Sequence, residues 1–239
     1  MTTVRELAKM IDHSILNPTM TDADLIRECG VAKKYDVASV CVKPYAVKLA
    51  AERLKGTKVE IGCVIGFPHG NSSTVVKVFE AEQACKDGAT EIDMVINIGK
   101  ALGGDWDYVE KEIKAVTGIC HKNKALVKVI FETDYISRIE DKIKLCEICT
   151  RVGADFVKTS SGYGFVKQPN GDFNYKGATI EDIKLMRKHS GPKVQVKCAG
   201  GVRTLTDLLN MKEAGATRSG ATATEVMLKD AMIKFPVLR

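Results

Sequence analysis

The sequence predicts an α/β protein in which residues 1–239 form one (β/α)8 barrel (TIM barrel), and three observations support this. Short apolar segments typical of strands alternate along the chain with amphipathic segments typical of helices. Three expected helices end in Gly-Ala and lead directly into a strand, at Gly88, Gly153 and Gly215, a spacing of about two βα units. Eight strands can be placed, and eight βα units need about 250 residues, close to the 239 present.

The first half of the chain predicts four strands, because short apolar runs are each closed by turn residues. In order, the expected elements are a leading helix (1–10), a strand (11–16) ended by Asn-Pro, a helix (21–35), a strand (38–42) stopped before a proline, a helix (45–54), a strand (59–65) closed by Gly-Phe-Pro-His-Gly, a helix (75–87) and a strand (91–97).

The second half continues the same alternation. In order, it predicts a helix capped by Asp105, a strand (126–131), a helix opened by Ser137, a strand that starts at Phe156 and stops in a polar turn ending at Gly162, a helix from Thr179, a strand containing Lys197, a helix from Thr204, a strand (217–221) and a helix (224–235).

The helices are expected to begin at capping residues and to bury one apolar face. Thr21 and Asp105 are suitable N-caps, and Ser137-x-x-Glu140 has the spacing of a capping box. The expected inward faces are Leu25, Ile26, Cys29 and Ala32 in the second helix, Trp106, Val109, Ile113 and Val116 in the helix after Asp105, and Ile139, Ile143, Cys146 and Cys149 in the helix after Ser137.

A doubly wound open sheet is the alternative architecture for alternating strands and helices. It is disfavoured because no Gly-x-Gly-x-x-Gly motif follows the first strand. One segment, 163–177, is longer than an ordinary βα loop. It contains Pro169-Asn170-Gly171-Asp172 between aromatic and polar residues, which predicts an inserted β-hairpin near the functional end of the barrel.

Composition excludes several classes of protein. The chain is 45% hydrophobic and 28% charged, as in ordinary globular proteins, and its net charge of +6 is spread evenly, which favours anionic substrates. No nucleic-acid recognition motif accompanies this charge. We expect no signal peptide, because Met1 to Ile11 is an interrupted pattern, and no membrane span, because no apolar run approaches 18 residues.

Cysteine usage predicts a cytoplasmic protein with reduced thiols. The eight cysteines are scattered through apolar contexts rather than spaced as a disulfide framework. Cys146-x-x-Cys149 has the spacing of a redox or metal pair, but no second pair accompanies it, and we interpret both residues as part of a helix core. The four histidines form no His-x-His or His-Glu cluster, so we expect no metal and no cofactor.

Charged residues occur inside the predicted strands, where burial makes them unfavourable unless they are used. Strand alternation places Asp93, Lys128, Lys158 and Lys197 on inward faces, and Asp12 of the first strand is a further candidate. Each residue alone could be a solvated or structural charge. Two lysines and an acid on different strands of one barrel indicate a catalytic site at the C-terminal ends of the strands.

Such a site suits imine chemistry. A free lysine has a pKa of about 10.4, so only about one in 2,500 is deprotonated at pH 7. Burial and a neighbouring cation lower that pKa, and Lys197 near Lys158 would favour a neutral, nucleophilic Lys158. This reasoning does not decide which of the two lysines attacks. Cys41 is also expected to point into the barrel, because it occupies an inward strand position.

The chain resembles the deoxyribose-phosphate aldolase family over nearly its whole length. The segments that carry the resemblance are Ile11–Asn17, Val64–Gly70, Glu91-Ile92-Asp93-Met94-Val95-Ile96-Asn97, Phe156-Val157-Lys158-Thr159-Ser160-Ser161-Gly162 and Lys197-Cys198-Ala199-Gly200-Gly201-Val202-Arg203-Thr204. The resemblance implies a metal-free class I aldolase on a (β/α)8 barrel. Such an enzyme reversibly cleaves 2-deoxy-D-ribose 5-phosphate to acetaldehyde and D-glyceraldehyde 3-phosphate through a lysine Schiff base.

The resemblance also implies roles for individual residues. Lys158 matches the Schiff-base lysine, Lys197 the second lysine that perturbs it, and Asp93 the carboxylate that transfers protons, with Asp12 and Lys128 as supporting residues. The phosphate-binding positions that match are Gly162, Gly200, Gly201, Gly220 and Thr222. The family also implies a homo-oligomer, a dimer or a tetramer. Small aldehydes and sugar phosphates are the expected partners, with no nucleic acid and no membrane.

Three departures from the family pattern concern the substrate. The last turn reads Thr222-Ala223 where the family usually offers two serines, Ser219 occupies an apolar strand position, and segment 163–177 replaces a short loop. Two alternatives therefore remain open beside the family's reaction. One is a Schiff-base aldolase that takes a different or non-phosphorylated aldehyde acceptor. The other is a non-catalytic barrel that binds a phosphorylated ligand.

Overall fold

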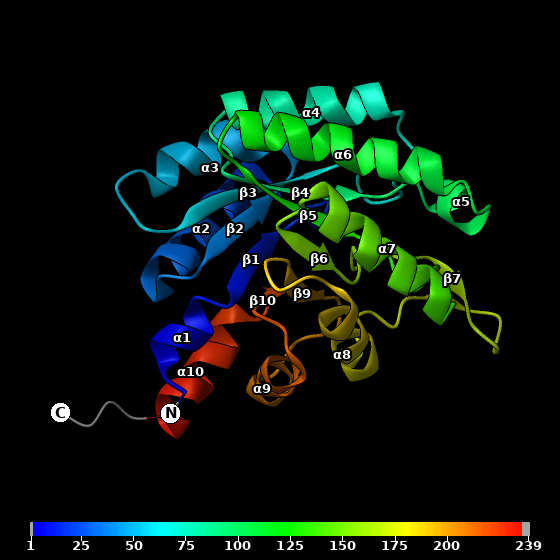
Figure 1. Cartoon of the computed structure of the whole chain (residues 1–239). Coiled ribbons are helices and arrows are strands. Elements are labelled where there is room, and N and C mark those ends of the chain that lie inside the picture. Colours follow the sequence, from blue (N-terminus) through cyan, green and yellow to red (C-terminus); the bar gives the residue numbers. More distant parts are fainter. Residues whose placement is uncertain (1, 236–239) are drawn as a thin grey trace.

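The computed structural model describes residues 2–235, and eight strands of this part of the chain form one closed parallel barrel (Figure 1). Their order around the barrel is β1-β10-β9-β6-β5-β4-β3-β2. The strands are β1 (Ile11–Ile15), β2 (Ser39–Val42), β3 (Glu60–Ile65), β4 (Glu91–Val95), β5 (Leu126–Ile130), β6 (Phe156–Lys158), β9 (Gln195–Ala199) and β10 (Arg218–Ala221). The predicted TIM barrel is confirmed, and the open doubly wound sheet is wrong.

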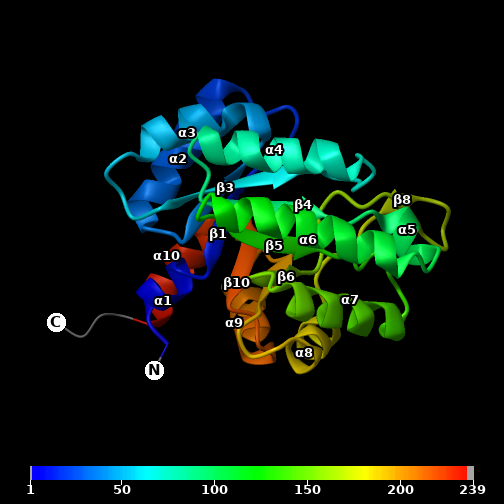
Figure 2. The same cartoon turned by 45° about the horizontal axis from the view of Figure 1, so that its top comes forward.

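Helices lie around the outside of the barrel, where their apolar faces cover the strands (Figures 1 and 2). They are α1 (Val4–Ala8), α2 (Asp22–Tyr35), a 3-10 turn η1 (Pro44–Ala46), α3 (Val47–Leu54), α4 (Thr74–Lys86), α5 (Ile98–Leu102), α6 (Trp106–Lys122), α7 (Ile139–Val152), α8 (Ile180–His189), α9 (Leu205–Ala214) and α10 (Thr224–Lys234). No helix within residues 2–235 has both the length and the apolar character that crossing a membrane requires.

Most predicted helix boundaries are confirmed by capping contacts. The Thr21 side chain accepts a hydrogen bond from Asp24 N–H, and Asp105 accepts one from Tyr108 N–H. The glycines of the three Gly-Ala steps have positive φ angles of 112°, 79° and 112°, a conformation that favours glycine at the end of a helix. Helix α5 was not predicted, because its five residues are too few to show a period.

The prediction for α7 was partly wrong. Arg138, not Ser137, is the N-cap residue, and no side chain caps this helix. The chain turns immediately before it, where Ile136 N–H donates to the Glu132 carbonyl oxygen, and this turn moves Ser137 out of the capping position. Ile139 is 58% exposed, whereas Lys142 is buried and pairs with Asp182 of α8 at 2.5 Å.

The other two predicted faces are largely correct. Leu25, Cys29 and Ala32 are buried in α2, but Ile26 is 37% exposed. The face of this helix that packs against the barrel is narrower than the row of apolar residues in its sequence. Val109, Ile113 and Val116 are buried in α6, and Trp106 is partly buried against the core. Cys146 and Cys149 are both buried on the core side of α7, as the interpretation of this pair required.

An antiparallel pair of short strands, β7 (Val166–Lys167) and β8 (Phe173–Asn174), lies inside segment 163–177. Figure 2 shows β8 in a loop that extends away from the barrel. Phe165 and Phe173 stack with their ring centroids 4.3 Å apart, and both rings are largely exposed. The segment leaves the barrel at the end of β6, the strand that carries Lys158, and returns at the start of α8.

Candidate active site

Strand register brings the predicted charged residues together inside the barrel. Asp93 of β4 is paired with Lys128 of β5, and Lys158 of β6 is paired with Lys197 of β9. Lys158 is also opposite Ile130, two residues beyond Lys128, so the two later lysines lie one side-chain layer closer to the C-terminal end of the barrel. Because side chains alternate along a strand, all four side chains point inward.

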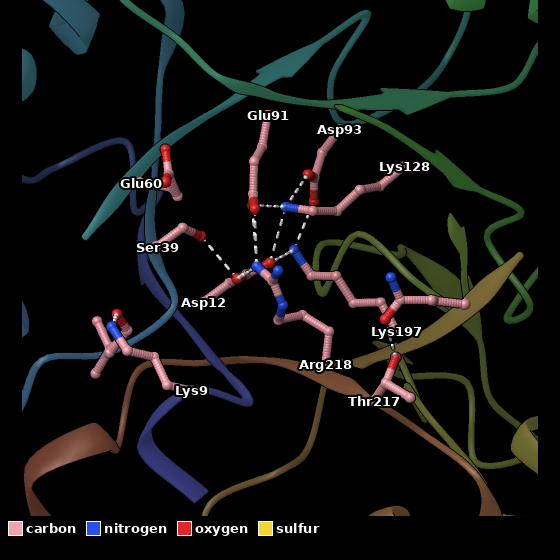
Figure 3. A network of polar contacts seen from close by, with 12 residues as sticks. Lys9, Asp12, Ser39, Glu60, Glu91, Asp93, Lys128, Lys197, Thr217 and Arg218 are labelled. Carbon is pink, nitrogen blue, oxygen red and sulfur yellow. Dashed lines mark hydrogen bonds and ion pairs between the residues drawn. The ribbon is translucent and has the colours of Figure 1, made fainter. Parts of the chain in front are cut away.

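Lys128 is the centre of the lower part of this cluster. Its Nζ lies 2.9 Å from Asp12 Oδ2, 2.5 Å from Glu91 Oε2 and 3.0 Å from Asp93 Oδ1. Figure 3 shows these carboxylates around the end of Lys128, with the Arg218 side chain reaching Asp12 and Glu91 from below in this view. Arg218 Nη1 lies 2.5 Å from Asp12 Oδ1 and 3.0 Å from Glu91 Oε2. Asp12 and Glu91 therefore each have two cationic neighbours in this layer.

Asp93 joins this lower cluster to the two lysines above it. Its Oδ2 atom lies 2.6 Å from Lys158 Nζ and 2.7 Å from Lys197 Nζ, and Lys197 also contacts Asp12 Oδ2 at 2.5 Å. Asp12 and Asp93 are fully buried, and Lys158 is only 2% exposed. A single carboxylate oxygen thus bridges two amines, which is the geometry needed to move a proton between them.

The two lysines differ in their pKa shifts. Burial lowers the pKa of Lys158, and the nearby charge of Lys197 lowers it further, although Asp93 opposes both effects. Burial also acts against the Lys197 ammonium, but Asp12 and Asp93 together raise its pKa above the usual value. This difference identifies Lys158 as the amine that is more readily neutral, a choice that the sequence left open.

Asp93 remains ionised in this environment. Burial alone would raise the pKa of its carboxyl group, but Lys128, Lys158 and Lys197 hold that pKa well below its usual range. Its Oδ1 atom is buried and makes no hydrogen bond among residues 2–235, although Lys128 lies at ion-pair distance from it. Asp93 therefore joins the two layers, with Oδ1 facing Lys128 and Oδ2 facing Lys158 and Lys197.

A pocket of about 140 Å³ opens directly above the lysines, at the C-terminal ends of the strands. Lys158 and Lys197 line it, whereas Asp12, Asp93 and Lys128 do not and lie beneath these two lysines. All five residues predicted to bind phosphate line the same pocket, namely Gly162, Gly200, Gly201, Gly220 and Thr222. The candidate catalytic and phosphate-binding residues thus share one cavity.

Cys41 also lines this pocket, in agreement with its predicted inward position. It is 2% exposed, and burial raises the pKa of its thiol to about 11. The thiol is therefore neutral near pH 7 and a poor nucleophile beside Lys158.

Sequence reasoning missed four residues of this region. Glu91 and Arg218 complete the ion cluster, and Tyr163 and Tyr175 line the pocket. Strand alternation could have found Arg218, because it shares a face with Gly220, but one arginine in a short polar strand resembles an exposed residue. Tyr175 gave no signal, because it lies in the irregular part of the insertion.

Comparison with known proteins agrees with this geometry. The model of the DeoC/LacD family aldolases matches residues 7–228. The chain belongs to this family. A deoxyribose-phosphate aldolase of Rhodopirellula baltica is 50% identical over 226 residues, which cover 95% of this chain and 89% of that protein. A deoxyribose-phosphate aldolase of Thermococcus gammatolerans is 50% identical over 220 residues, covering 91% of this chain and 93% of that protein.

A solved structure extends the comparison to three dimensions. The deoxyribose phosphate aldolase from Aeropyrum pernix, described as a tetramer, superposes with a TM-score of 0.85 at 26% identity. The match covers 97% of this chain and 92% of that one. The chain is therefore an aldolase of this family, and the pocket lined by Lys158 and Lys197 is its candidate active site.

Proposed function

We propose that the protein is a class I deoxyribose-phosphate aldolase, a carbon–carbon lyase that uses Lys158 as its Schiff-base nucleophile. The observation that carries the proposal is one carboxylate oxygen shared by two buried lysines whose pKa values shift in opposite directions. The reaction is the reversible cleavage of 2-deoxy-D-ribose 5-phosphate to acetaldehyde and D-glyceraldehyde 3-phosphate. The high similarity to two curated relatives with this name supports the choice of substrate.

In the cleavage direction, the neutral Lys158 amine attacks C1 of the open-chain sugar and forms a carbinolamine. A proton delivered to its hydroxyl group lets water leave, and a protonated imine results. Asp93 and Lys197 are suited to this transfer, because Asp93 Oδ2 is within hydrogen-bond distance of both Lys158 Nζ and Lys197 Nζ.

The protonated imine is an electron sink. Removal of the proton from the C3 hydroxyl group breaks the C2–C3 bond, and the electron pair enters the imine to give an enamine. Glyceraldehyde 3-phosphate leaves from the C3 side. Protonation of the enamine at C2 regenerates the imine, and water releases acetaldehyde and free Lys158.

The remaining residues support this chemistry. Asp12 and Lys128 hold Lys197 and Asp93 in place through contacts of 2.5 and 3.0 Å. Gly162, Gly200 and Gly201 have positive φ angles of 83° to 85° in tight turns, whose backbone N–H groups are suited to a phosphate group. Gly220 and Thr222 line the side of the pocket formed by the end of β10.

Borohydride trapping tests the nucleophile. Acetaldehyde with borohydride should leave an ethyl group on Lys158, which peptide mass spectrometry locates. Lys158→Arg retains a positive charge but forms no imine, so turnover should fall by about 10⁴-fold or more. Lys167→Ala, at an exposed position of the insertion, is the matched control, and its Lys158 should be trapped normally. Trapping only at another lysine contradicts the proposal.

A second candidate keeps the chemistry and changes the acceptor to a non-phosphorylated aldehyde. Ala223 and the insertion favour it, because the last turn offers one hydroxyl group where the family usually offers two, and the insertion adds Tyr163 and Tyr175 to the pocket lining. Comparison of kcat/KM for 2-deoxyribose 5-phosphate and for 2-deoxyribose separates the two candidates. A non-catalytic binding barrel would require that no lysine is trapped and neither sugar is cleaved.

We also infer a cytoplasmic homo-oligomer, a dimer or a tetramer. The eight cysteines, all within residues 2–235, are unpaired, which is typical of a reducing compartment. The Aeropyrum pernix relative is described as tetrameric. Light scattering coupled to gel filtration measures the mass in solution, and a monomer at micromolar concentration would contradict the inference.

A further inference from the structure

The insertion returns from solvent onto the wall of the candidate pocket. Ala178 N–H donates to the Gly200 carbonyl oxygen at 3.1 Å. A β-carbon added at Gly177 would stand 2.6 Å from the Gly200 carbonyl carbon, so only glycine permits this approach. The end of the insertion is therefore packed directly against the Gly200–Gly201 turn.

The loop that follows β5 holds the insertion in place. The Asp134 carboxylate accepts hydrogen bonds from Lys176 N–H at 2.5 Å and from Gly177 N–H at 3.1 Å. The Tyr135 hydroxyl group accepts one from Phe165 N–H at 2.8 Å, at the other end of the insertion. These contacts fix both ends of the insertion to the same loop, so its position relative to the pocket is defined.

Tyr175 lies at the point where the insertion meets the pocket. It is partly buried and lines the cavity together with Lys158 and Lys197. Its ring atom Cε2 lies 3.6 Å from the site of a β-carbon on Gly200. Because Cε2 is bonded to the carbon that carries the hydroxyl group, the phenol group lies at the Gly200 turn.

We propose that Tyr175 is a specificity-determining residue whose hydroxyl group donates a hydrogen bond to the phosphate end of the substrate at the Gly200–Gly201 turn. The inference rests on the proposed function for the place of the phosphate. It explains how the pocket retains hydroxyl donors although Ala223 follows Thr222 in the last turn. The insertion then strengthens the preference for a phosphorylated acceptor instead of weakening it.

Tyr175→Phe tests the hydroxyl group with the ring retained. The quantity to measure is the ratio of kcat/KM for 2-deoxyribose 5-phosphate to that for 2-deoxyribose. A hydrogen bond to a charged group is lost, so the ratio should fall about tenfold or more, mainly through a higher KM for the phosphoester. Lys167→Ala alters the exposed part of the insertion only and should keep the wild-type ratio. An unchanged ratio in Tyr175→Phe overturns the inference.

Asp134→Ala tests whether the placement of the return segment matters for the Tyr175 hydroxyl group. It removes the acceptor of Lys176 N–H and Gly177 N–H, so the return segment loosens and the ratio should fall in the same direction. If both residues act through the Tyr175 hydroxyl group, the double variant adds little to either single variant. Fully additive effects would show that Tyr175 acts independently of this contact and would contradict the positioning argument.

A direct binding measurement keeps this inference distinct from the proposed function. If the wild-type protein cleaves neither sugar, the proposed function fails. Calorimetric titration with glyceraldehyde 3-phosphate and with inorganic phosphate still tests Tyr175. About tenfold weaker binding of glyceraldehyde 3-phosphate to Tyr175→Phe supports the inference, and equal binding refutes it.

Discussion

The floor and the rim of the pocket are built by different means. The floor, formed by Lys158 and Lys197 together with Asp12, Asp93 and Lys128 beneath them, is made of side chains on barrel strands held by ion pairs. The rim, formed by the insertion and the glycine turns, is made of loops joined through backbone hydrogen bonds. The floor supplies the reactive groups, and the rim determines which substrate reaches them.

The difference has an energetic basis. Charges in the floor are almost fully removed from water, so each tolerates its burial only because opposite charges and hydrogen bonds surround it. The rim is partly exposed and contains few buried charges, so it can change length and sequence without loss of the fold. A family can therefore retain one reaction while its members vary in substrate.

Asp93→Asn tests the floor most severely. The change leaves Lys128, Lys158 and Lys197 without their common carboxylate, so we expect turnover to fall by about 10²- to 10⁴-fold. Loss of one partner from a buried ion cluster should also lower the free energy of unfolding by about 3–5 kcal/mol. Steady-state kinetics and urea denaturation measure the two effects.

Asp134→Ala is the matched comparison for Asp93→Asn, because Asp134 serves the rim. It should lose far less stability, since its partners are two backbone N–H groups near the surface. If Asp93→Asn and Asp134→Ala lowered the free energy of unfolding equally, floor and rim would not differ in how much their polar contacts stabilise the fold.

Lys197→Met tests how the floor sets the reactivity of Lys158. Below its lowered pKa Lys158 is protonated and unreactive, so the rate of imine formation should rise as pH increases through that pKa. Without the Lys197 charge the pKa of Lys158 rises, and the ascending limb should move to higher pH. Turnover at pH 7 should fall by about 10²- to 10⁴-fold, because a proton-transfer group is also lost. The measurement is borohydride trapping with acetaldehyde across a pH series.

Glu132 provides the control for this pH series. Burial raises the pKa of its carboxyl group to about 7, and its oxygens accept a hydrogen bond from Ser161 N–H beside the Lys158 strand. Its titration could therefore be mistaken for that of Lys158. An ascending limb that survives in Glu132→Gln belongs to Lys158, whereas a limb that disappears would assign it to Glu132.

The sequence was sufficient to predict the charged residues of the floor, the glycine turns and the hairpin, but not where the insertion meets the pocket. Strand alternation placed Asp93, Lys128, Lys158 and Lys197 inside the barrel, because period two and parallel register leave few alternatives. Which lysine is neutral depends on the number of carboxylates that surround each amine, and this is a property of three-dimensional distance. Tyr175 could not be placed, since its position depends on hydrogen bonds from a loop about 40 residues earlier in the chain.

A pair of buried serines gives the smallest and most direct test of why the barrel tolerates buried polar groups. Ser219 and Ser39 are both 0% exposed on barrel strands. Ser39 Oγ donates to Asp12 Oδ1 at 2.7 Å, whereas Ser219 Oγ has no hydrogen-bond partner among residues 2–235. If burial is acceptable only for satisfied groups, Ser219→Ala should raise the free energy of unfolding by about 1 kcal/mol, and Ser39→Ala should lower it by about 1.5–3 kcal/mol. Urea denaturation measures both values, and a loss of stability in Ser219→Ala as large as that in Ser39→Ala would show that satisfied hydrogen bonds are not what distinguishes the two positions.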